Sequence, residues 1–500
     1  MLLKLIKENL VDKKQLLIDV ANMLSEEQIN VDENDLYDAA ADRYKKYAKA
    51  RKVLDVPPPA AIVYPNNKEE VQTLLKYCNE NKINCIPRAG KTATEGGLEN
   101  WKELTLVIDC KNMDKIINID SYNMQATVQA GVALMDLEIE LNKVGYTTGH
   151  SPQSKPVAKY GGLVATRSIG QFSTLYGGIE DMVVGLECVF PDGHCSLIKN
   201  VPRRSGGPDI RHIAIGNEGT LCYITEVTVK IFKHFPENNR FFGYLIKDVS
   251  SGIQILREVM VNGYRPSVAR VYSEEDARQH FHHFHEGKCV LLFMAEGPVS
   301  LAKVTGEGIE EAVDKFSSSI IKKVDSSLIE NWFNNLNWSQ QDIDDEFEGM
   351  KENDSHDGYT TEISADWETI PKIYDSVIKR IKESFDRAHD LTMLGGHSSH
   401  SYINGTNLYF VYNYKINCAP EDELGVYHHP IQRIIVEETL KHGGSMCHHH
   451  GIGKYRNEWC EEEHGSAYYM LEKLKKAFDP NNIMNFGTIF YQEEGAKFQN

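Results

Sequence analysis

The sequence is short of positive charge. Its 54 lysines and arginines stand against 72 aspartates and glutamates, so the formal net charge at pH 7 is −18. A protein that binds nucleic acid or an anionic membrane surface needs a basic patch, and a chain-wide electrostatic footprint of that kind is missing. We therefore expect no nucleic-acid partner.

Closely spaced cysteine pairs are also lacking. The chain has 10 cysteines, spread out without a CxxC pair. A chain of this length can bury a large core without disulfide staples, and reduced thiols are typical of the cytosol. The cysteine pattern therefore favours a cytoplasmic protein.

Long apolar runs are absent as well. No stretch approaches 18 uncharged apolar residues, so we expect no membrane-spanning helix. MLLKLIKENL at 1–10 begins like a signal peptide, but Lys4, Lys7 and Glu8 interrupt it before an h-region is complete. The final KFQN is not a peroxisomal address of the SKL type. Both ends of the chain again favour the cytoplasm.

The length and apolar content are sufficient for two large domains. The chain has 500 residues, 41% of them hydrophobic, which is more than one core usually holds. Apolar residues recur at helical spacing in the first 50 residues, and Pro57-Pro58-Pro59 ends this helical pattern. Runs of β-branched residues, typical of strands, follow from 104 to 232. The predicted class is α+β, with a helical arm at 1–56, a first domain at 57–235, a second domain at 236–446 and a C-terminal return at 447–500.

Glycines and hydroxyl side chains gather in the first domain at 87–97, 151–193 and 207–226. Such loops can turn several backbone N–H groups toward a pyrophosphate, where a Cβ would crowd the approach. GKT at 90–92 is not a P-loop, because a P-loop needs glycine at the position of Cys85. Separate segments of this kind in one domain indicate a phosphate-bearing cofactor more specifically than any one of them.

The order and the amino-acid sequences of these segments resemble those of the vanillyl-alcohol oxidase superfamily, which has a PCMH-type FAD domain. GGLVATRSIGQFSTLYGGIEDMVVGL and RSGGPDIRHIAIGNEGTL are similar to the alkyldihydroxyacetonephosphate synthase family in particular. The resemblance runs from about Pro57 to the C-terminus. It implies a split FAD-binding domain with an inserted α+β cap domain.

The same resemblance implies a set of FAD-binding residues. They are Pro87, Arg88, Ala89, Gly90, Lys91, Thr92, Ala93, Gly96, Gly97, Gln153, Ser154, Gly161, Gly162, Thr166, Arg167, Ser168, Glu218, Gly219, Thr220 and Ile224. The first loop reads AGKT where the family usually has GGGT, so Lys91 replaces a glycine. Because 87–97 holds no histidine or cysteine, we expect FAD to be bound noncovalently.

The string HHHGIGK at 448–454 is the most distinctive in the chain. If it is extended, His448 and His450 share one face and His449 faces away, which makes a poor metal cage. Surface histidines, a metal site and catalysis all stay open on the pattern alone. The string is similar to the synthase family's HHHGVGK, which implies an active-site role for His448, His449 and His450. Imidazole that exchanges protons near pH 7 suits such a role beside a flavin.

Other candidate groups come from the same resemblance. Tyr409 matches the tyrosine assigned as acid in the synthase family, and His150 and Arg270 match its functional histidine and arginine. On the pattern alone, a core aromatic of a strand is the favoured interpretation of Tyr409. His150 fits a turn residue, and Arg270 half of a surface ion pair, as well as they fit an active site. Together they would supply proton transfer and charge stabilisation at a substrate oxygen.

Metal-dependent 2-hydroxy-acid dehydrogenases share this scaffold, and the sequence disfavours their mechanism. Their HxGDGNxH segment aligns with 402–409, where Tyr402 and Tyr409 replace both histidines. A phenol is a weak metal ligand at neutral pH, so no metal is expected. HFHHFHEG at 280–287 is a further histidine cluster, for which a solvated helix face is favoured over a metal site.

The synthase family grips a substrate phosphate with an arginine upstream of the segment aligned with 364–367. Here the upstream region 340–351 is acidic and contains no arginine, so it is expected to repel a phosphate dianion. The predicted function is an FAD-dependent enzyme acting on a small oxygenated substrate. Synthase-type transfer at flavin N5 and dehydrogenation of an alcohol or hydroxy acid both stay open, a homodimer is allowed, and no redox partner is named.

Overall fold

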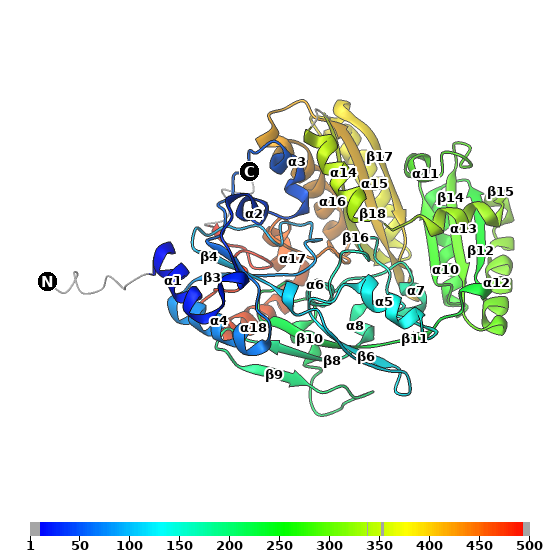
Figure 1. Ribbon diagram of the computed structural model, residues 1–500. Helices are drawn as coiled ribbons and strands as arrows, with labels where there is room; N and C mark the ends of the chain where they lie inside the picture. The colour runs from blue at the N-terminus through cyan, green and yellow to red at the C-terminus, as the bar shows by residue number, and fades with distance from the viewer. Residues whose placement is uncertain (1–10, 338, 352–354, 494–500) are drawn as a thin grey trace.

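The computed structural model describes residues 11–337, 339–351 and 355–493 (Figure 1). The expectations about the leader-like start at 1–10 and the terminal KFQN lie outside the described residues. Within the described ranges, no helix is both long and apolar enough to cross a bilayer.

The structure has two halves, of which the first contains β1 to β11 and the second contains β12 to β18. The first sheet of the first half is small and mainly parallel. Its order is β1 (Ile29–Asn30), β2 (Ala61–Val63), β4 (Thr105–Asp109) and β3 (Asn84–Arg88). Helix α4 (Lys68–Asn81) connects β2 to β3, and the Asn67 side chain caps it by accepting from the Glu70 N–H at 2.9 Å. The apolar positions Val71, Leu74 and Leu75 of α4 are fully buried, as their helical spacing predicts.

A second, antiparallel sheet completes this half. Its order is β5 (Ile116–Asp120), β6 (Gln125–Gln129), β10 (Tyr223–Lys230), β8 (Val183–Val189) and β9 (Cys195–Ile198). Helices α5 (Leu134–Asn142), α6 (Tyr160–Ala165) and α8 (Ile179–Met182) share its apolar core. A two-stranded ribbon joins β7 (Tyr146–Thr147) to β11 (Phe232–Lys233).

The second half is built on a seven-stranded antiparallel sheet, called the cap sheet below. Its order is β15 (Ile320–Val324), β12 (Arg240–Ile246), β14 (Cys289–Ala295), β13 (Val268–Tyr272), β17 (Leu391–Ser398), β18 (Gly405–Lys415) and β16 (His356–Asp366). These strands are green and yellow in Figure 1. Its core is shared with helices α10 (Val249–Val261), α12 (Val299–Asp314), α15 (Thr369–Ser384) and α16 (His429–Lys441).

The alternation of side chains along β18 gives the cap sheet two different faces. Leu408, Phe410 and Tyr412 are completely buried in the core shared with the helices. Tyr409 and Val411, the residues between them, line a cavity on the opposite face. A strand turns successive side chains to opposite faces, so the cavity receives every second residue of this strand.

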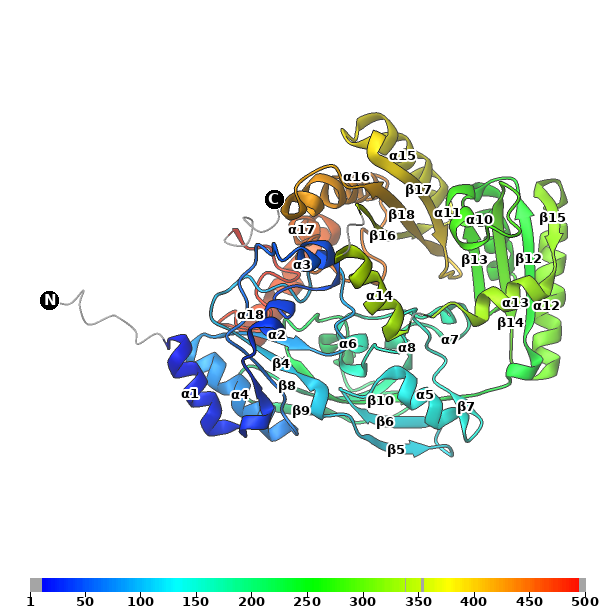
Figure 2. The same ribbon diagram turned by 45° about the horizontal axis from the view of Figure 1, so that its top comes forward.

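The N-terminal arm contacts both halves. Helix α1 (Lys13–Met23) buries Leu16 and Val20 in the core of the small sheet, while Tyr44 and Tyr47 join the core of the cap sheet. Further elements of the arm are α2 (Glu33–Asp38) and α3 (Lys46–Ala50). Helix α3 packs against α14 (Gln340–Lys351) at the junction of the halves (Figure 2).

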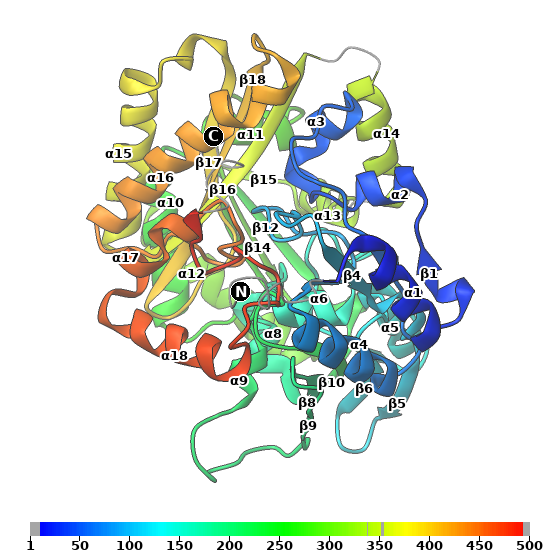
Figure 3. The same ribbon diagram turned by 90° about the vertical axis from the view of Figure 1, so that its left-hand side faces the viewer.

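The C-terminal segment returns to the first half. After α17 (Cys460–His464) and α18 (Tyr468–Phe478), Met484 forms a parallel bridge with Cys85 of β3. Asn481 donates to the Asn79 backbone at 3.2 Å, so this segment runs beside α4 (Figure 3). The same return carries the 448–454 string to the junction of the halves.

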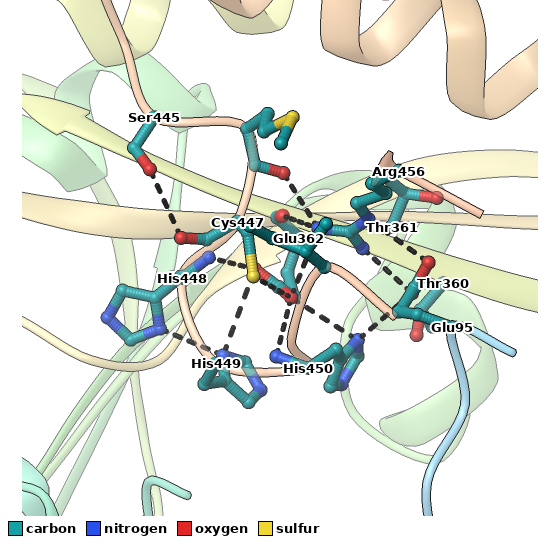
Figure 4. Close-up of polar contacts among 12 residues, drawn as sticks. Glu95, Thr360, Thr361, Glu362, Ser445, Cys447, His448, His449, His450 and Arg456 are labelled. Carbon is teal, nitrogen blue, oxygen red and sulfur yellow. Dashed lines mark hydrogen bonds and ion pairs between the residues drawn. The ribbon is translucent and has the colours of Figure 1, made fainter. Parts of the chain in front are cut away.

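A buried arginine between two carboxylates links these parts (Figure 4). Arg456 is completely buried and its guanidinium lies 2.8 Å from Glu95 and 3.4 Å from Glu362. Glu95 belongs to the first half and Glu362 to β16. Burial raises the pKa of Glu95 even against the pull of Arg456. Burial acts the same way on Glu362, but Arg456 and the neighbouring histidines hold its pKa below the ordinary value.

We expect Arg456→Met to lower the free energy of unfolding by about 3 to 5 kcal/mol, because two buried carboxylates lose their counter-charge. In the variant, the folded-state pKa values of these carboxylates rise above their unfolded values. Stability is then present below the unfolded pKa and lost as pH rises, so the deficit in Tm should be larger at about pH 8 than at about pH 5.

Arg433→Met is the matched control, because Arg433 pairs with Glu458 at 2.9 Å while its side chain is 52% exposed. A surface pair of this kind contributes about 0 to 1 kcal/mol. The measurement is the Tm of both variants and of the wild type at each of the two pH values. Equal losses for the two variants, or a deficit that does not change with pH, would contradict the linking role of Arg456.

Candidate active site

A cavity of about 460 Å³ lies between the glycine-rich loops of the first half and the cap sheet. The predicted cofactor residues that line it are Pro87, Arg88, Ala89, Gly90, Lys91, Thr92, Ala93, Gly97, Gln153, Ser154, Gly161, Gly162, Thr166, Ser168, Glu218, Gly219 and Ile224. The glycine-rich segments that the sequence singled out therefore meet around one space.

The lining does not include Gly96, Arg167 or Thr220. Gly96 has φ +72° and a Cβ there would come within 2.7 Å of the Tyr455 ring, so its role is in the turn. Arg167 reaches outward to Glu180 at 3.3 Å. The Thr220 hydroxyl donates to the Asn217 carbonyl at 2.7 Å inside the core.

The loop 89–94 has free donors. Among the residues that the structure describes, the backbone N–H groups of this loop find no acceptor. Gly90 packs so closely on the second segment that a Cβ would lie 2.7 Å from the Val157 carbonyl oxygen. Lys91 takes the left-handed conformation, φ 58°, that a glycine would adopt without strain, and its ammonium lies 3.9 Å from Asp38. A cradle of free N–H groups fits the pyrophosphate of a dinucleotide.

Glu218 lines the cavity, but its carboxylate is engaged elsewhere. It accepts the N–H groups of Ile452 and Gly453, each at 2.8 Å. Burial raises the pKa of Glu218 to about 7, even though both N–H groups oppose the shift. Its carboxylate therefore holds the 448–454 string in place, rather than being free for a cofactor.

The cavity face of the cap sheet carries one cross-strand row. Tyr272 of β13 is in register with His397 of β17, His397 with Tyr409 of β18, and Tyr409 with Glu362 of β16. Directly opposed residues share a face of a sheet. The His397 ring accordingly stacks between Tyr272, at 4.9 Å, and Tyr409, at 4.5 Å between ring centroids.

The histidine string bends instead of running extended. The Glu362 carboxylate accepts the N–H of His448 at 2.5 Å and that of His450 at 2.8 Å, which draws the backbone around it (Figure 4). His449 and His450 line the cavity, and His448 does not. The backbone bends at each of residues 448–450, so the extended string on which the expected alternation depended is not formed.

A hydrogen-bonded chain leads away from the cavity through this string. The Tyr409 hydroxyl lies 2.5 Å from His449 Nε2, His449 Nδ1 lies 2.8 Å from His448 Nδ1, and His448 Nε2 lies 2.7 Å from the Tyr402 hydroxyl. Both ring nitrogens of His448 and of His449 are thus occupied.

These histidines are neutral at pH 7, which differs from the expectation of titration near neutrality. Burial, together with the positive charge of Arg456, lowers the pKa of His450 to about 3. Burial lowers the pKa of His448 to about 4 against the pull of Glu362, and it lowers that of His449 well below the ordinary value. Burial likewise raises the pKa of Tyr409, so its phenol is protonated. Desolvation outweighs the opposing effect of Glu362 for His448 and His449.

Arg270 is not half of a surface ion pair. It lines the cavity with 5% of its surface exposed, and its Nε and Nη1 have no hydrogen-bond partner in the part of the chain that the structure describes. Its guanidinium lies 5.2 Å from the Tyr272 ring centroid and 5.5 Å from that of Trp332. A buried guanidinium with free donors is equipped to hold an anionic or carbonyl oxygen.

His150 stands behind the cavity wall. It is 2% exposed, does not line the cavity, and places Nε2 3.2 Å from the hydroxyl of Ser168, which does. Burial, with a further effect of Lys155, lowers the pKa of His150 to about 3. Its position suits orientation of Ser168 better than contact with a substrate.

The acidic segment at 340–351 is largely neutralised or turned outward. Only Glu346 of this segment lines the cavity, and it pairs with Arg43 at 2.7 Å and Lys46 at 2.8 Å. The other carboxylates of the segment are exposed. The expected cluster of repelling charge is therefore reduced to one compensated carboxylate, because the N-terminal arm supplies cations that the sequence did not link to it.

Several lining residues escaped the sequence analysis. Arg43, Tyr44 and Lys46 come from the arm, and His397 and His400 come from β17 and its end. No local pattern marks the arm residues, whereas His397 and His400 could have been found from the histidines of GGHSSH. At 280–287, His282 and His283 are exposed, but the predicted helix face is wrong, because α11 ends at His280, which lines the cavity, and turns follow it. Over the described residues, no group of three or more histidine, cysteine or acidic side chains is arranged to hold a metal.

Two family models match the chain. The model of the FAD binding domain matches residues 59–197, and that of the C-terminal domain of FAD linked oxidases matches residues 235–489. The uncharacterized FAD-linked oxidoreductase YgcU of Escherichia coli K12 is 58% identical over 93% of this chain and 96% of its own length. An alkyldihydroxyacetonephosphate synthase of Caenorhabditis elegans is 28% identical over 85% of this chain and 75% of its own length.

Solved structures show the same fold. An alkyldihydroxyacetonephosphate synthase superposes with a TM-score of 0.75 at 21% identity, covering 95% of this chain and 85% of that one. p-Cresol methylhydroxylase superposes with a TM-score of 0.74 at 16% identity, covering 96% and 97%. The expected α+β, PCMH-type fold and the FAD cofactor are thereby confirmed, and the chain belongs to the family of FAD-linked oxidoreductases.

Proposed function

We propose that this protein dehydrogenates a small hydroxylated substrate that carries an anionic group, a 2-hydroxy acid being the simplest example. The observation that carries the proposal is Arg270, a buried cation of the cavity whose Nε and Nη1 are unpaired within the described chain. A charged group left without a partner in a buried site costs free energy, and a substrate carboxylate would relieve that cost. Bound FAD supplies a two-electron acceptor at N5.

The cofactor is held by the residues whose N–H groups and side chains line the first-half side of the cavity. The loop 89–94 would cradle the pyrophosphate, while Gln153, Ser154 and Ser168 lie on the second segment across from it. Tyr409, His449 and His450 face this space from the cap side. The flavin ring would then lie between the two sets.

Tyr409 and His450 hold the reacting oxygen in this proposal. A protonated phenol and neutral imidazoles can donate or accept a hydrogen bond without adding charge, and their buried position excludes water. Arg270 fixes the anionic end, so the carbinol carbon is oriented relative to the flavin. The role of each residue follows from what its atoms can donate or accept in this geometry.

Synthase-type transfer is the second candidate. HHHGIGK and Tyr409 match that family, and the similarity to the synthase of Caenorhabditis elegans covers 85% of this chain. Against it stands the pairing of two cations of the cavity, because Arg43 and Lys46 are already engaged by Glu346. A phosphate dianion would then meet the guanidinium of Arg270, whose single charge balances a carboxylate but not a dianion.

Tyr409→Phe and His450→Ala should each reduce substrate-dependent flavin reduction by a factor of about 10² to 10⁴ while FAD stays bound. Each change removes a hydrogen-bonding group that faces the reacting oxygen. Stopped-flow absorbance of the flavin under anaerobic conditions measures the rate. Tyr412→Phe is the control for the first change, since Tyr412 lies on the opposite face of β18. A near-normal rate of flavin reduction in Tyr409→Phe would contradict the proposed role and indicate that Tyr409 only packs in the sheet.

The substrate class is tested by comparing reactions on the purified holoenzyme. Lactate, glycolate and glycerate should bleach the flavin anaerobically, and acyl-dihydroxyacetone phosphate with a fatty alcohol should give little ether lipid. The physical reason is the charge of the Arg270 guanidinium, which matches that of a carboxylate. Efficient ether formation at micromolar acyl-dihydroxyacetone phosphate, without bleaching by any hydroxy acid, would favour the transfer reaction instead.

A further inference from the structure

A buried carboxylate orients one of the cavity histidines. Asp276, on α11 (Glu274–His280), is fully buried, and its Oδ2 lies 2.6 Å from Nδ1 of His397. A carboxylate only accepts hydrogen bonds when ionised, so Nδ1 carries the proton and donates it. The opposite nitrogen, Nε2, is left with its lone pair.

His397 is a cavity residue whose second ring nitrogen is not engaged within the described chain. The residue lines the cavity, is 8% exposed, and its Nε2 has no hydrogen-bond partner among the described residues. The rings of Tyr272 and Tyr409 on either side fix its plane. A fixed tautomer and a fixed ring plane are what a proton acceptor needs from its surroundings.

The other histidines of the site are less suited to this task. His448 and His449 use both ring nitrogens in the chain to Tyr402 and Tyr409. His400 has its Nδ1 at 2.8 Å from the Ser173 hydroxyl, which can donate or accept and so leaves the tautomer open. The nearest carboxylate to His450 Nδ1 is Glu362 at 3.5 Å, and Glu362 already serves Arg456 and backbone N–H groups.

We propose that His397, oriented by Asp276, accepts the proton of the substrate hydroxyl during dehydrogenation. This inference rests on the proposed function. The O–H bond breaks and its proton moves to His397 Nε2. The O–H electron pair forms the carbonyl π bond, and the carbinol C–H bond breaks with its electron pair leaving as hydride to oxidised FAD. The substrate is oxidised by two electrons, and FAD is reduced by the same two.

The electrostatic surroundings are consistent with a base that is neutral before reaction. Burial lowers the pKa of His397, while Asp276 opposes that shift and Arg270 adds to it. Asp276 itself keeps a pKa well below the ordinary range, because its contacts with His397 and His280 outweigh its burial. The charged and titratable groups around the ring are thus Asp276, His280, Arg270, Tyr272 and Tyr409.

A purely structural role would be to tie α11 to β17, and the experiment must separate the two roles. Anaerobic stopped-flow reduction by lactate, glycolate or glycerate is followed across a pH range for the wild type, His397→Gln, Asp276→Asn and Asp276→Glu. His397→Gln should bind FAD normally and reduce it about 10² to 10⁴ times more slowly, with KM little changed. The rise of rate with pH, which reports deprotonation of the base, should disappear.

The Asp276 variants test orientation. In Asp276→Asn the loss of the negative charge lowers the pKa of His397, so the ascending limb should move to lower pH and the plateau should fall. Asp276→Glu keeps the charge and should recover part of the plateau. Since these variants act through His397, they report on the inference even where His397→Gln fails to fold. His389→Gln is the matched control, because the His389 side chain is 70% exposed and lies 3.7 Å from Asp390 just before β17.

The outcomes are distinguishable. A wild-type flavin that no hydroxylated probe reduces overturns the proposed function and, with it, this inference. Reduction of the wild type together with near-normal rates and an unchanged pH profile in His397→Gln overturns the role of His397 alone. Asp276 variants that lose stability but keep the wild-type pH profile would assign the pair to structure only.

Discussion

The position of Arg456 between Glu95 and Glu362 is the constraint on which the site depends. One guanidinium joins a loop of the first half, a cap strand and the returning C-terminal segment. A buried charge of this kind is costly unless its partners stay in place, so the relative position of the three parts is fixed by that cost. Glu362 then uses its remaining acceptor capacity to bend the histidine string toward the cavity. The Glu362 carboxylate therefore both pairs with Arg456 and positions the histidine string.

The cap sheet supplies the substrate side through its register. Because Tyr272, His397, Tyr409 and Glu362 stand opposite one another on consecutive strands, they form one row, of which Tyr272, His397 and Tyr409 line the cavity. Helices cover the other face with an apolar core, so a one-residue slip of any strand would exchange a functional group for a core residue. The apolar packing of the helices on one face of the cap sheet therefore fixes which side chains point into the cavity on the other face.

What could be predicted from the sequence was local. The glycine and hydroxyl loops carry their conformational requirements in their own residues, and all but Gly96, Arg167 and Thr220 of the predicted set line the cavity. The Asp276–His397 pair and the contacts of Glu346 with Arg43 join residues 121 and 303 positions apart, and no local pattern signals them. The histidine string was predicted as important through resemblance, but its bend depends on Glu362 from a distant strand. Long-range ion pairs and cross-strand register account for most of what the sequence did not reveal.

The claim that a free guanidinium selects an anionic hydroxy substrate is open to one direct measurement. The rate of anaerobic flavin reduction is compared for lactate and for uncharged 1,2-propanediol, in the wild type and in Arg270→Met. The account predicts a strong preference of the wild type for lactate and its loss in the variant, since a charge-assisted hydrogen bond contributes about 1.5 to 3 kcal/mol. Equal rates for the two compounds in the wild type, or an unchanged preference in Arg270→Met, would contradict it.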